Sequence, residues 1–157
     1  MPMTKPFFNT QAIQTVLNTS KVIEKDKTEH EAEYYAPFGY TYDYYVIDDG
    51  IEFTKNKKEN NRRIELMTKA CYVSKENEKK ISGLLQKFDE NETIDWKKES
   101  AERKASACTS FEMNSSGFKA VSEGNKERFV YFSIPNDTGW QVKVNGKDTD
   151  IVEINGR

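Results

Sequence analysis

Aromatic side chains set beside amides and carboxylates are the residues of this chain best suited to chemistry, and the chemistry they suit is sugar recognition. Trp140 follows a polar turn, with Asn136, Asp137 and Asn145 close to it in the sequence. An indole ring can stack on the C–H face of a pyranose while amides and carboxylates bind its hydroxyl groups. The alternative interpretation is a core tryptophan packed over a sheet, whose burial stabilises the fold by about 2–3 kcal/mol.

Tyrosines form a second aromatic group, made up of Tyr34, Tyr35, Tyr40, Tyr42, Tyr44 and Tyr45. Their alternation with other residues predicts a strand near 40–47 with one aromatic face. That strand either has one buried and one exposed row, or presents an aromatic contact surface to a glycan or a partner loop. The candidate glycan contacts are therefore Trp140, Tyr40, Tyr42, Tyr44, Tyr45 and Asn145.

Residue types that carry catalysis are present without the spacing that catalysis requires. The chain has no G-x-S-x-G, no S-x-x-K with its partner motifs and no glycine-rich phosphate loop. Carboxylate pairs such as Asp48–Asp49 fall in polar turns, where both members stay ionised and solvated. His30 is the single histidine, whereas a metal site needs two or three convergent ligands. We therefore expect no catalysis, no metal ion and no cofactor.

The two cysteines, Cys71 and Cys108, are not a C-x-x-C pair and have no histidine near them, so a zinc site is not expected. A disulfide between them would stabilise the fold by about 3–4 kcal/mol. The alternative is two unpaired, half-buried thiols. Both interpretations stay open, because a sequence does not give the distance between the two sulfurs.

Composition indicates one folded domain with a polar exterior. Of the 157 residues, 36% are hydrophobic, 32% are charged and 12% are aromatic, whereas disordered chains are poor in aromatics. The net charge of −2 argues against nucleic acid, whose partners usually carry a basic excess. Lysine-rich segments at 55–63 and 97–104 are interleaved with glutamate; they are solvated faces or contacts for an anionic surface such as a phospholipid.

Targeting signals are not evident in the sequence. No stretch is apolar enough to span a membrane, and the first residues lack the apolar run of a secretory signal. We expect the chain to be a segment of a larger protein.

Apolar spacing predicts three helices. Two of them cover residues 9–23 and 59–72, the second with apolar side chains spaced by three and four. The third follows Ser74, which can cap it. Its stripe, the clearest in the chain, is Ile81, Leu84, Leu85 and Phe88. Residues 89–100 are polar and predicted to be a loop.

Alternation of apolar and polar residues predicts strands in the rest of the chain. Strands at 107–113 and 118–121 are joined by a polar turn, and 129–134 reads as a central strand buried on both faces. A hairpin follows around Asn145-Gly146, a dipeptide that favours a two-residue turn. The predicted cross-strand pairs are Val144–Lys147, Lys143–Asp148, Val142–Thr149 and Trp140–Ile151.

Three segments carry a family resemblance. The first segment, at residues 35–45, is YAPFGYTYDYY; the second, at 111–120, is FEMNSSGFKA; and the third, at 133–147, is SIPNDTGWQVKVNGK. Arg103 lies just before the predicted β-rich region that begins at residue 105. These features resemble the C-terminal extracytoplasmic region of the YfhO family of bacterial multi-spanning membrane proteins. In that family a strand ends in Ser-x-Pro, Gly-Trp follows a polar turn, and an Asn-Gly or Asp-Gly turn comes next. The matching residues are Ser133, Pro135, Gly139, Trp140, Asn145 and Gly146.

The resemblance implies a parent protein with many membrane helices, of the GT-C type of lipid-linked-sugar glycosyltransferase. Such proteins glycosylate cell-wall polymers such as lipoteichoic acid, with a catalytic carboxylate in an early extracytoplasmic loop. No part of this chain corresponds to that loop. The family's pattern also continues beyond the hairpin with further strands. The resemblance therefore implies a glycosyltransferase parent, a fragment without catalysis, and a sheet that can lack an edge strand.

Taken together, these features predict an α+β, mainly β fold: a jelly-roll-like β-sandwich with appended helices. Residues 1–104 form a helical and mixed region with the aromatic strand near 40–47, residues 105–157 form a β-rich region, and together they make one extracytoplasmic domain. The resemblance implies a place at a bacterial cell membrane.

The expected function is to bind or position a cell-wall glycan or teichoic acid near the parent's active site. The rival is a structural or protein-interaction module with every aromatic buried, which braces the parent's membrane helices or contacts a partner protein. A free-standing hydrolase would need convergent carboxylates in a cleft.

Overall fold

The computed structural model describes residues 10–17, 21–23, 26–34, 38–48, 55–124 and 128–156. About 25% of the described residues are helical and about 28% are in strands, so neither type of element dominates. The described strands form five sheets, four with two strands and one with three. The fold is therefore mixed α and β, and a jelly-roll-like sandwich is not confirmed.

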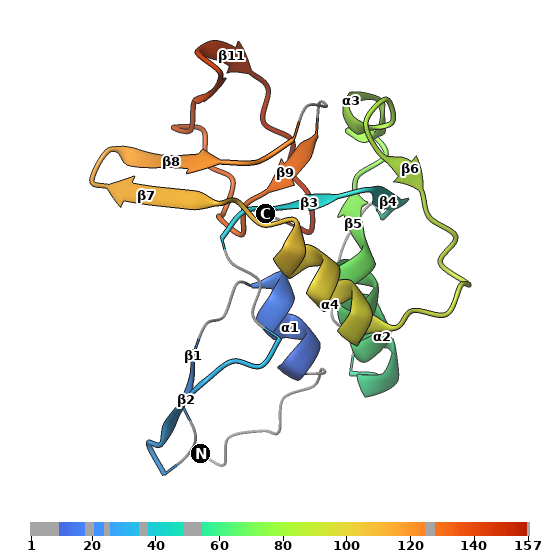
Figure 1. Ribbon diagram of the computed structural model, residues 1–157. Helices are drawn as coiled ribbons and strands as arrows, with labels where there is room; N and C mark the ends of the chain where they lie inside the picture. The colour runs from blue at the N-terminus through green and yellow to red at the C-terminus, as the bar shows by residue number, and fades with distance from the viewer. Residues whose placement is uncertain are drawn as a thin grey trace.

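A parallel three-stranded sheet organises one half of the molecule (Figure 1). β4 (Tyr44–Ile47) lies between β5 (Ala70–Val73) and β6 (Gln86–Lys87), and the three strands run in the same direction. The connection from β4 to β5 contains α2 (Lys57–Lys69), as the crossover of a parallel pair requires. Side chains on both faces of the sheet are buried: Tyr45, Cys71 and Val73 in one cluster, Val46, Ala70 and Tyr72 in another.

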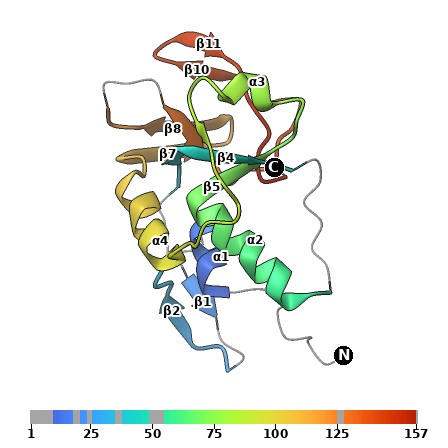
Figure 2. The ribbon, with the colours of Figure 1, turned by 90° about the vertical axis from the view of Figure 1, so that its right-hand side faces the viewer.

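Helices cover one face of this sheet (Figure 2). α1 (Thr10–Val16), α2 and α4 (Trp96–Ala105) pack on one another, and α1 and α2 add their apolar side chains to the cluster on that face. Asn56 starts α2 and Asp95 starts α4, because each side chain accepts a hydrogen bond from a free N–H of the first helical turn.

Short antiparallel strands lie on the other face. β3 (Tyr40–Tyr42) pairs with β9 (Phe129–Tyr131), and their tyrosines join the cluster that contains Tyr45, Cys71 and Val73. Two hairpins project beyond them, away from the helices (Figure 1); they are β7 (Ser110–Asn114) with β8 (Gly117–Val121), and β10 (Val142–Val144) with β11 (Lys147–Thr149). We call the parallel sheet with its helices the packed half, and the two hairpins with the residues between them the hairpin half.

Two predicted helices are shorter than expected. The helix predicted over 9–23 ends at Val16, and β1 (Lys21–Ile23) then pairs with β2 (Glu29–Glu31). The helix predicted over 59–72 ends at Lys69, where the chain enters β5. Strand pairing overrides helical spacing at β5, because Ala70–Val73 fills the place beside β4 and buries all four of its residues.

The helix predicted from the stripe Ile81, Leu84, Leu85 and Phe88 is also shorter than expected. α3 (Glu78–Ile81) is a single turn, and the chain then turns into β6, where the Gln86 N–H donates to the Asp43 carbonyl at 2.9 Å. Ile81, Leu85 and Phe88 are buried as predicted, but Leu84 is 45% exposed, which a continuous helix with that stripe would not allow. Ser74 does not cap α3; its hydroxyl accepts from the Asn77 N–H in the preceding turn.

The predicted polar loop at 89–100 is wrong in its second half, because α4 begins at Trp96. Its start signal is Asp95, whose carboxylate accepts from the Lys98 N–H at 3.3 Å. This helix has few apolar residues, and the residues that it buries include two charged ones, Glu99 and Arg103. A helix with a polar buried face gives no hydrophobic period in the sequence.

Both predicted hairpins are confirmed. β7 and β8 pair around the turn between Asn114 and Gly117. β10 and β11 pair in the predicted register, Val142–Thr149, Lys143–Asp148 and Val144–Lys147, but the ladder ends there and does not pair Trp140 with Ile151. The central strand predicted over 129–134 is wrong: β9 has three residues and pairs with β3 alone among the described strands.

Candidate functional site

Five aromatic rings meet where the hairpin half joins the rest of the molecule, and we call them the aromatic cluster. They are Phe38, Phe111, Phe118, Phe132 and Trp140. The ring centroids of Phe38 and Phe111 are 4.2 Å apart, those of Phe118 and Phe132 are 4.9 Å apart, and those of Phe118 and Trp140 are 5.8 Å apart. Tilted and edge-on contacts at these distances stabilise a group of rings beyond their burial.

Backbone geometry on both sides holds these rings in place. Gly39 has φ 76°, and a Cβ there would lie 2.6 Å from a ring carbon of Phe132 and 2.8 Å from the Cys108 sulfur. Only glycine fits this position, for its conformation and for its lack of a side chain. On the other side, Asp137 organises the turn before Trp140, since its carboxylate accepts from the Gly139 N–H and its carbonyl from the Trp140 N–H.

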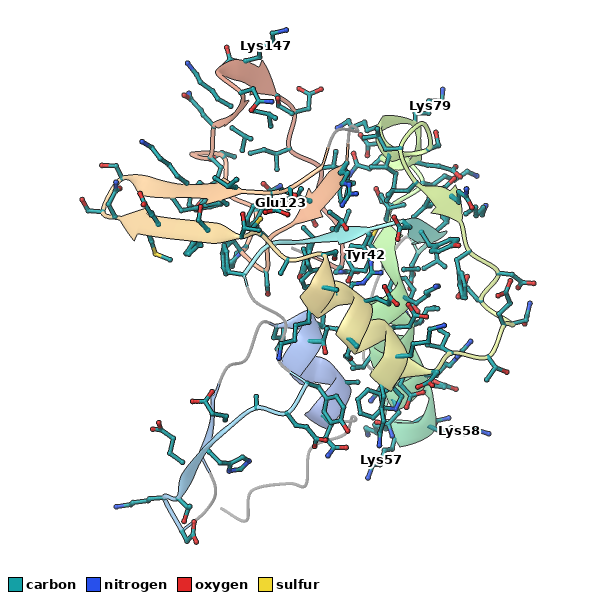
Figure 3. All side chains as sticks on the ribbon, in the orientation of Figure 1. Tyr42, Lys57, Lys58, Lys79, Glu123 and Lys147 are labelled. Atoms are coloured by element: carbon teal, nitrogen blue, oxygen red, sulfur yellow. The ribbon has the colours of Figure 1, made fainter. Side chains whose placement is uncertain are left out.

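The two hairpins and the segments beside them carry exposed apolar side chains, and those of Met113 and Val121 lie on opposite faces of the β7–β8 ladder. Trp140 is 37% exposed and Met113, beside Phe118 across the β7–β8 ladder, is 68% exposed. We call the exposed apolar set the hairpin surface: Met113, Val121, Trp140, Val144 and Ile151. Lys147, at the tip of β10–β11, lies at the opposite end of the molecule from Lys57 and Lys58 on α2 (Figure 3).

Three of the four tyrosines predicted to contact a glycan do not reach a surface. Tyr40 and Tyr42 are 0% and 2% exposed, and Tyr45 is also buried. The alternation breaks at Asp43, where the chain leaves its antiparallel partner and joins the parallel sheet. Helices cover one side of this stretch and the cluster that contains Tyr131 covers the other, so tyrosines of either parity are buried. The prediction of an aromatic contact row is therefore wrong.

Tyr44 is the exception in this stretch, being half-buried. Its ring packs edge-on against Phe88 at 5.6 Å, and the Lys69 ammonium lies 4.7 Å from the ring centroid. Tyr35 lies outside the described residues. Asn145 is exposed in the turn of the β10–β11 hairpin, as predicted for a turn residue.

Hydroxyl groups of the buried tyrosines make hydrogen bonds inside the core; Figure 3 labels Tyr42. Tyr42 donates to the Met67 carbonyl at 2.5 Å, lies 3.3 Å from the Tyr40 hydroxyl, and accepts from the Asn155 amide at 3.3 Å. Burial raises the pKa of Tyr40 and of Tyr42 well above its ordinary value. Both phenols are therefore neutral structural groups and do not serve as acids or bases near neutral pH.

Arg103 is the charged group of this core, with 4% of its surface exposed. Its guanidinium donates to the Thr41 carbonyl, lies 5.5 Å from the Tyr42 ring centroid, and is 3.9 Å from the Asp43 carboxylate. These contacts join α4 to the point where β3 passes into β4. The sequence indicates Arg103 only through the family resemblance, because no sequence pattern distinguishes a buried arginine in a chain rich in exposed lysine.

Neither cysteine forms a disulfide: both are free, with Cys71 buried and Cys108 half-buried. Burial raises the pKa of the Cys71 thiol to about 12, and it raises the pKa of Cys108 as well. The thiolate is the nucleophilic form, so neither side chain is activated for nucleophilic chemistry. The structure thus favours the interpretation of two unpaired thiols.

Two shallow depressions flank α2. One is lined by Lys57, Lys58, Asn61, Arg62 and Glu65. The neighbouring one adds Arg63, whose guanidinium is 2.5 Å from the Asp48 carboxylate. Arg62 donates to the carbonyls of Glu90 and Glu92 at 2.7 and 2.6 Å and so fixes the loop before α4. These two arginines serve internal contacts, and the depressions do not form an enclosed site.

The described part of the chain shows neither a metal-binding cluster nor a membrane-spanning helix. It contains no group of three or more histidine, cysteine, aspartate or glutamate side chains that could hold a metal ion, and His30 is exposed on β2. None of its helices combines the length and the apolar character needed to cross a bilayer.

No family model matches the chain, and neither a curated protein nor a solved structure matches it.

Proposed function

We propose that the chain is a non-catalytic interaction module on the extracytoplasmic side of a larger bacterial membrane protein similar to the YfhO family. In this proposal the hairpin surface is the contact surface. The observation that carries it is the division of the aromatic side chains: Tyr40, Tyr42 and Tyr45 are buried in the core, while Trp140, just before β10, is 37% exposed.

The chemistry of the hairpin surface supports a protein partner. Exposed apolar side chains and an exposed tryptophan are typical of protein–protein contacts. A two-stranded hairpin also leaves N–H and C=O groups unpaired along its outer edges, and another strand can pair with them. Strands supplied by the parent or a partner would extend β7–β8 or β10–β11, which is how the predicted jelly-roll-like sandwich could be completed.

A cell-wall glycan or teichoic acid is the second candidate partner. Trp140 favours it, because the indole is 37% exposed and the carboxylate of Asp137 lies in the turn beside it. One exposed ring makes a weaker sugar platform than the row of tyrosines predicted from the sequence. The parent in either case is a lipid-linked-sugar glycosyltransferase of the GT-C type, with its catalytic carboxylate outside this chain.

The location is tested by labelling intact cells that produce the full-length parent. A Ser115→Cys change places a thiol at the exposed β7–β8 turn, in a Cys108→Ala background that leaves only the buried Cys71. A membrane-impermeant maleimide should label this variant in intact cells. Labelling only after the cells are broken would refute the extracytoplasmic location. The Cys108→Ala parent without Ser115→Cys is the control.

The partner is tested by photo-crosslinking in the same cells. A photoreactive residue at Met113 probes the hairpin surface, and one at Lys57 probes the far end of the molecule (Figure 3). We expect crosslinks to protein from position 113 and not from position 57. Crosslinks from position 113 to polysaccharide would support the glycan instead. Equal crosslinking from both positions, or none from either, would contradict both candidates.

A further inference from the structure

Two Asn-Gly dipeptides in this chain share one local backbone conformation and differ in their surroundings. Asn145 and Gly146 have φ values of 52° and 80°, and Asn155 and Gly156 have φ values of 54° and 71°. Asn145 lies exposed in the turn of the β10–β11 hairpin, whereas Asn155 is 9% exposed in the core. The pair therefore separates the effect of the dipeptide from the effect of tertiary structure.

Asn-Gly dipeptides carry a known intrinsic chemistry. The backbone nitrogen of glycine attacks Cγ of the asparagine side chain and forms a cyclic imide; the Cγ–Nδ2 bond breaks, and Nδ2 leaves as ammonia with the proton that the backbone nitrogen gives up. Water then adds to either carbonyl of the ring and opens it to aspartate or to isoaspartate. Glycine favours the attack because no Cβ shields its nitrogen. Water is the only co-reactant.

Nothing in the described part of the chain restrains the side chain of Asn145. Its carboxamide makes no hydrogen bond to those residues, and no atom lies within 4 Å of the place that a Cβ of Gly146 would take. Pairing in the hairpin closes with Val144 opposite Lys147, so the Gly146 nitrogen stands in the turn outside the ladder. The carboxamide is free to rotate toward that nitrogen.

Asn155 is held at both ends of its carboxamide. Its Oδ1 accepts from the Tyr72 N–H at 2.8 Å and its Nδ2 donates to the Tyr42 hydroxyl at 3.3 Å. Its backbone N–H also donates to the Tyr72 carbonyl at 2.8 Å. Rotation of Cγ toward the Gly156 nitrogen would break these buried hydrogen bonds, so the reaction has to wait for local opening of the core.

We infer that Asn145 is a site of spontaneous imide formation in the folded protein and that Asn155 is protected from it. Isoaspartate at position 145 adds a methylene to the backbone of a two-residue turn and a negative charge beside the Lys143–Asp148 pair. Both changes oppose the register of β10–β11. The consequence is a slow, chemically driven alteration of the hairpin surface at Val144 and its neighbours.

The test is ageing of the purified chain in mildly alkaline buffer at physiological temperature, followed by trypsin and mass spectrometry. Trypsin separates the two dipeptides, releasing residues 144–147 and 148–157. We expect conversion at Asn145 to be at least about tenfold faster than at Asn155, because Asn155 reacts only after local opening. An enzymatic isoaspartate methylation assay should follow the same time course. Equal rates at the two positions in the folded chain would overturn the inference.

Three controls sharpen the result. In denaturant both dipeptides should convert at similar rates. A slower conversion of Asn155 in denaturant would show that the folded structure is not what protects it.

Asn145→Gln should abolish the fast conversion, because a glutamine would have to close a larger ring. Unchanged conversion would place the modification elsewhere. Tyr42→Phe removes one hydrogen bond of Asn155 and should raise its rate; no rise would refute protection by that contact.

Discussion

The packed half and the hairpin half differ in where their contacts come from. Strand β4 of the packed half is flanked by two strands that follow it in the chain, with helices over one face and the tyrosine core on the other. In the other half, the first strand of each hairpin pairs with the strand directly after the turn, and apolar side chains stay exposed. Contacts distant in sequence give the molecule its core, and local contacts give it its exposed hairpin surface.

This difference assigns separate tasks to the two halves. Side chains on both faces of β4 and β5 are buried, so substitutions in the packed half are expected to disturb the core. The strands of the two hairpins have intermediate or exposed residues, so substitutions on them are expected to leave the core intact. Substitutions in matched pairs, one in each half, test this division.

The largest contrast is expected between two isoleucines. Ile64 is buried between α2 and the parallel sheet, so Ile64→Ala removes packed methyl groups and should lower the free energy of unfolding by about 3 kcal/mol. Ile151 is 39% exposed after β11, and Ile151→Ala should change stability by no more than about 0.5 kcal/mol. Urea denaturation followed by circular dichroism measures both. Similar losses would show that the hairpin half is part of one core.

A second contrast lies between two asparagines with positive φ. Alanine strains the backbone equally at positions 145 and 155, so the difference between the two variants reports the side-chain hydrogen bonds. Asn155→Ala leaves the buried N–H of Tyr72 without its acceptor and should cost about 2 kcal/mol more than Asn145→Ala. Thermal and urea unfolding should agree on the sign. A smaller loss at 155 than at 145 would contradict the anchoring of the C-terminal segment.

Alkaline pH should lower the free energy of unfolding through the buried thiol of Cys71 in the packed half. The pKa of Cys71 is raised from 9.0 to about 12 in the folded chain, so the unfolded chain loses its proton at lower pH. The contribution of Cys71 to the free energy of unfolding is fully present below about pH 9. It decreases by about 1 kcal/mol per pH unit as the pH rises from 9 toward 12. Buried Tyr40 and Tyr42 titrate with the same sign.

The measurement is the urea midpoint as a function of pH, for the native chain and for Cys71→Ala. The variant should show a shallower alkaline decline. Thiol alkylation adds a second readout: Cys108, half-buried, should react in the folded chain, and Cys71 only with the rate of unfolding. Fast alkylation of both thiols in the native state would contradict the burial of the sheet.

The smallest effect is expected at the hairpin ion pair. Lys143 and Asp148 lie opposite each other with 3.8 Å between Nζ and Oδ1, and both side chains are exposed. Lys143→Ala should therefore change the free energy of unfolding by less than about 0.5 kcal/mol, and salt should erase the difference. A larger loss would show that the register of β10–β11 supports the core.

Features governed by neighbours in the chain were predictable. Asn145-Gly146 set the register of β10–β11, and the polar turn after Asn114 set that of β7–β8, because a two-residue turn leaves one way for the flanking strands to pair. Prediction failed where distant segments compete. The stripe from Ile81 to Phe88 has helical spacing, yet β6 forms there because β4 offers an open edge to it.

The candidate site divides in the same way. The sequence places Trp140 beside a turn but does not decide between a buried and an exposed indole, and the structure shows it 37% exposed. The burial of Tyr40, Tyr42 and Tyr45 could not be foreseen, because alternation predicts two faces but does not say which elements cover them. Arg103 in the core gave no signal, since its partners are a distant carbonyl and a distant ring.

The sequence by itself determined the turns, the two hairpin registers and the polar exterior, because each depends on residues a few positions apart. Only the tertiary structure decided that the tyrosines form a core, that Cys71 lies in a parallel strand, and that Asn155 is locked while Asn145 is free. Those outcomes depend on which distant segments meet, and burial on both faces of a strand is a property of its neighbours in space.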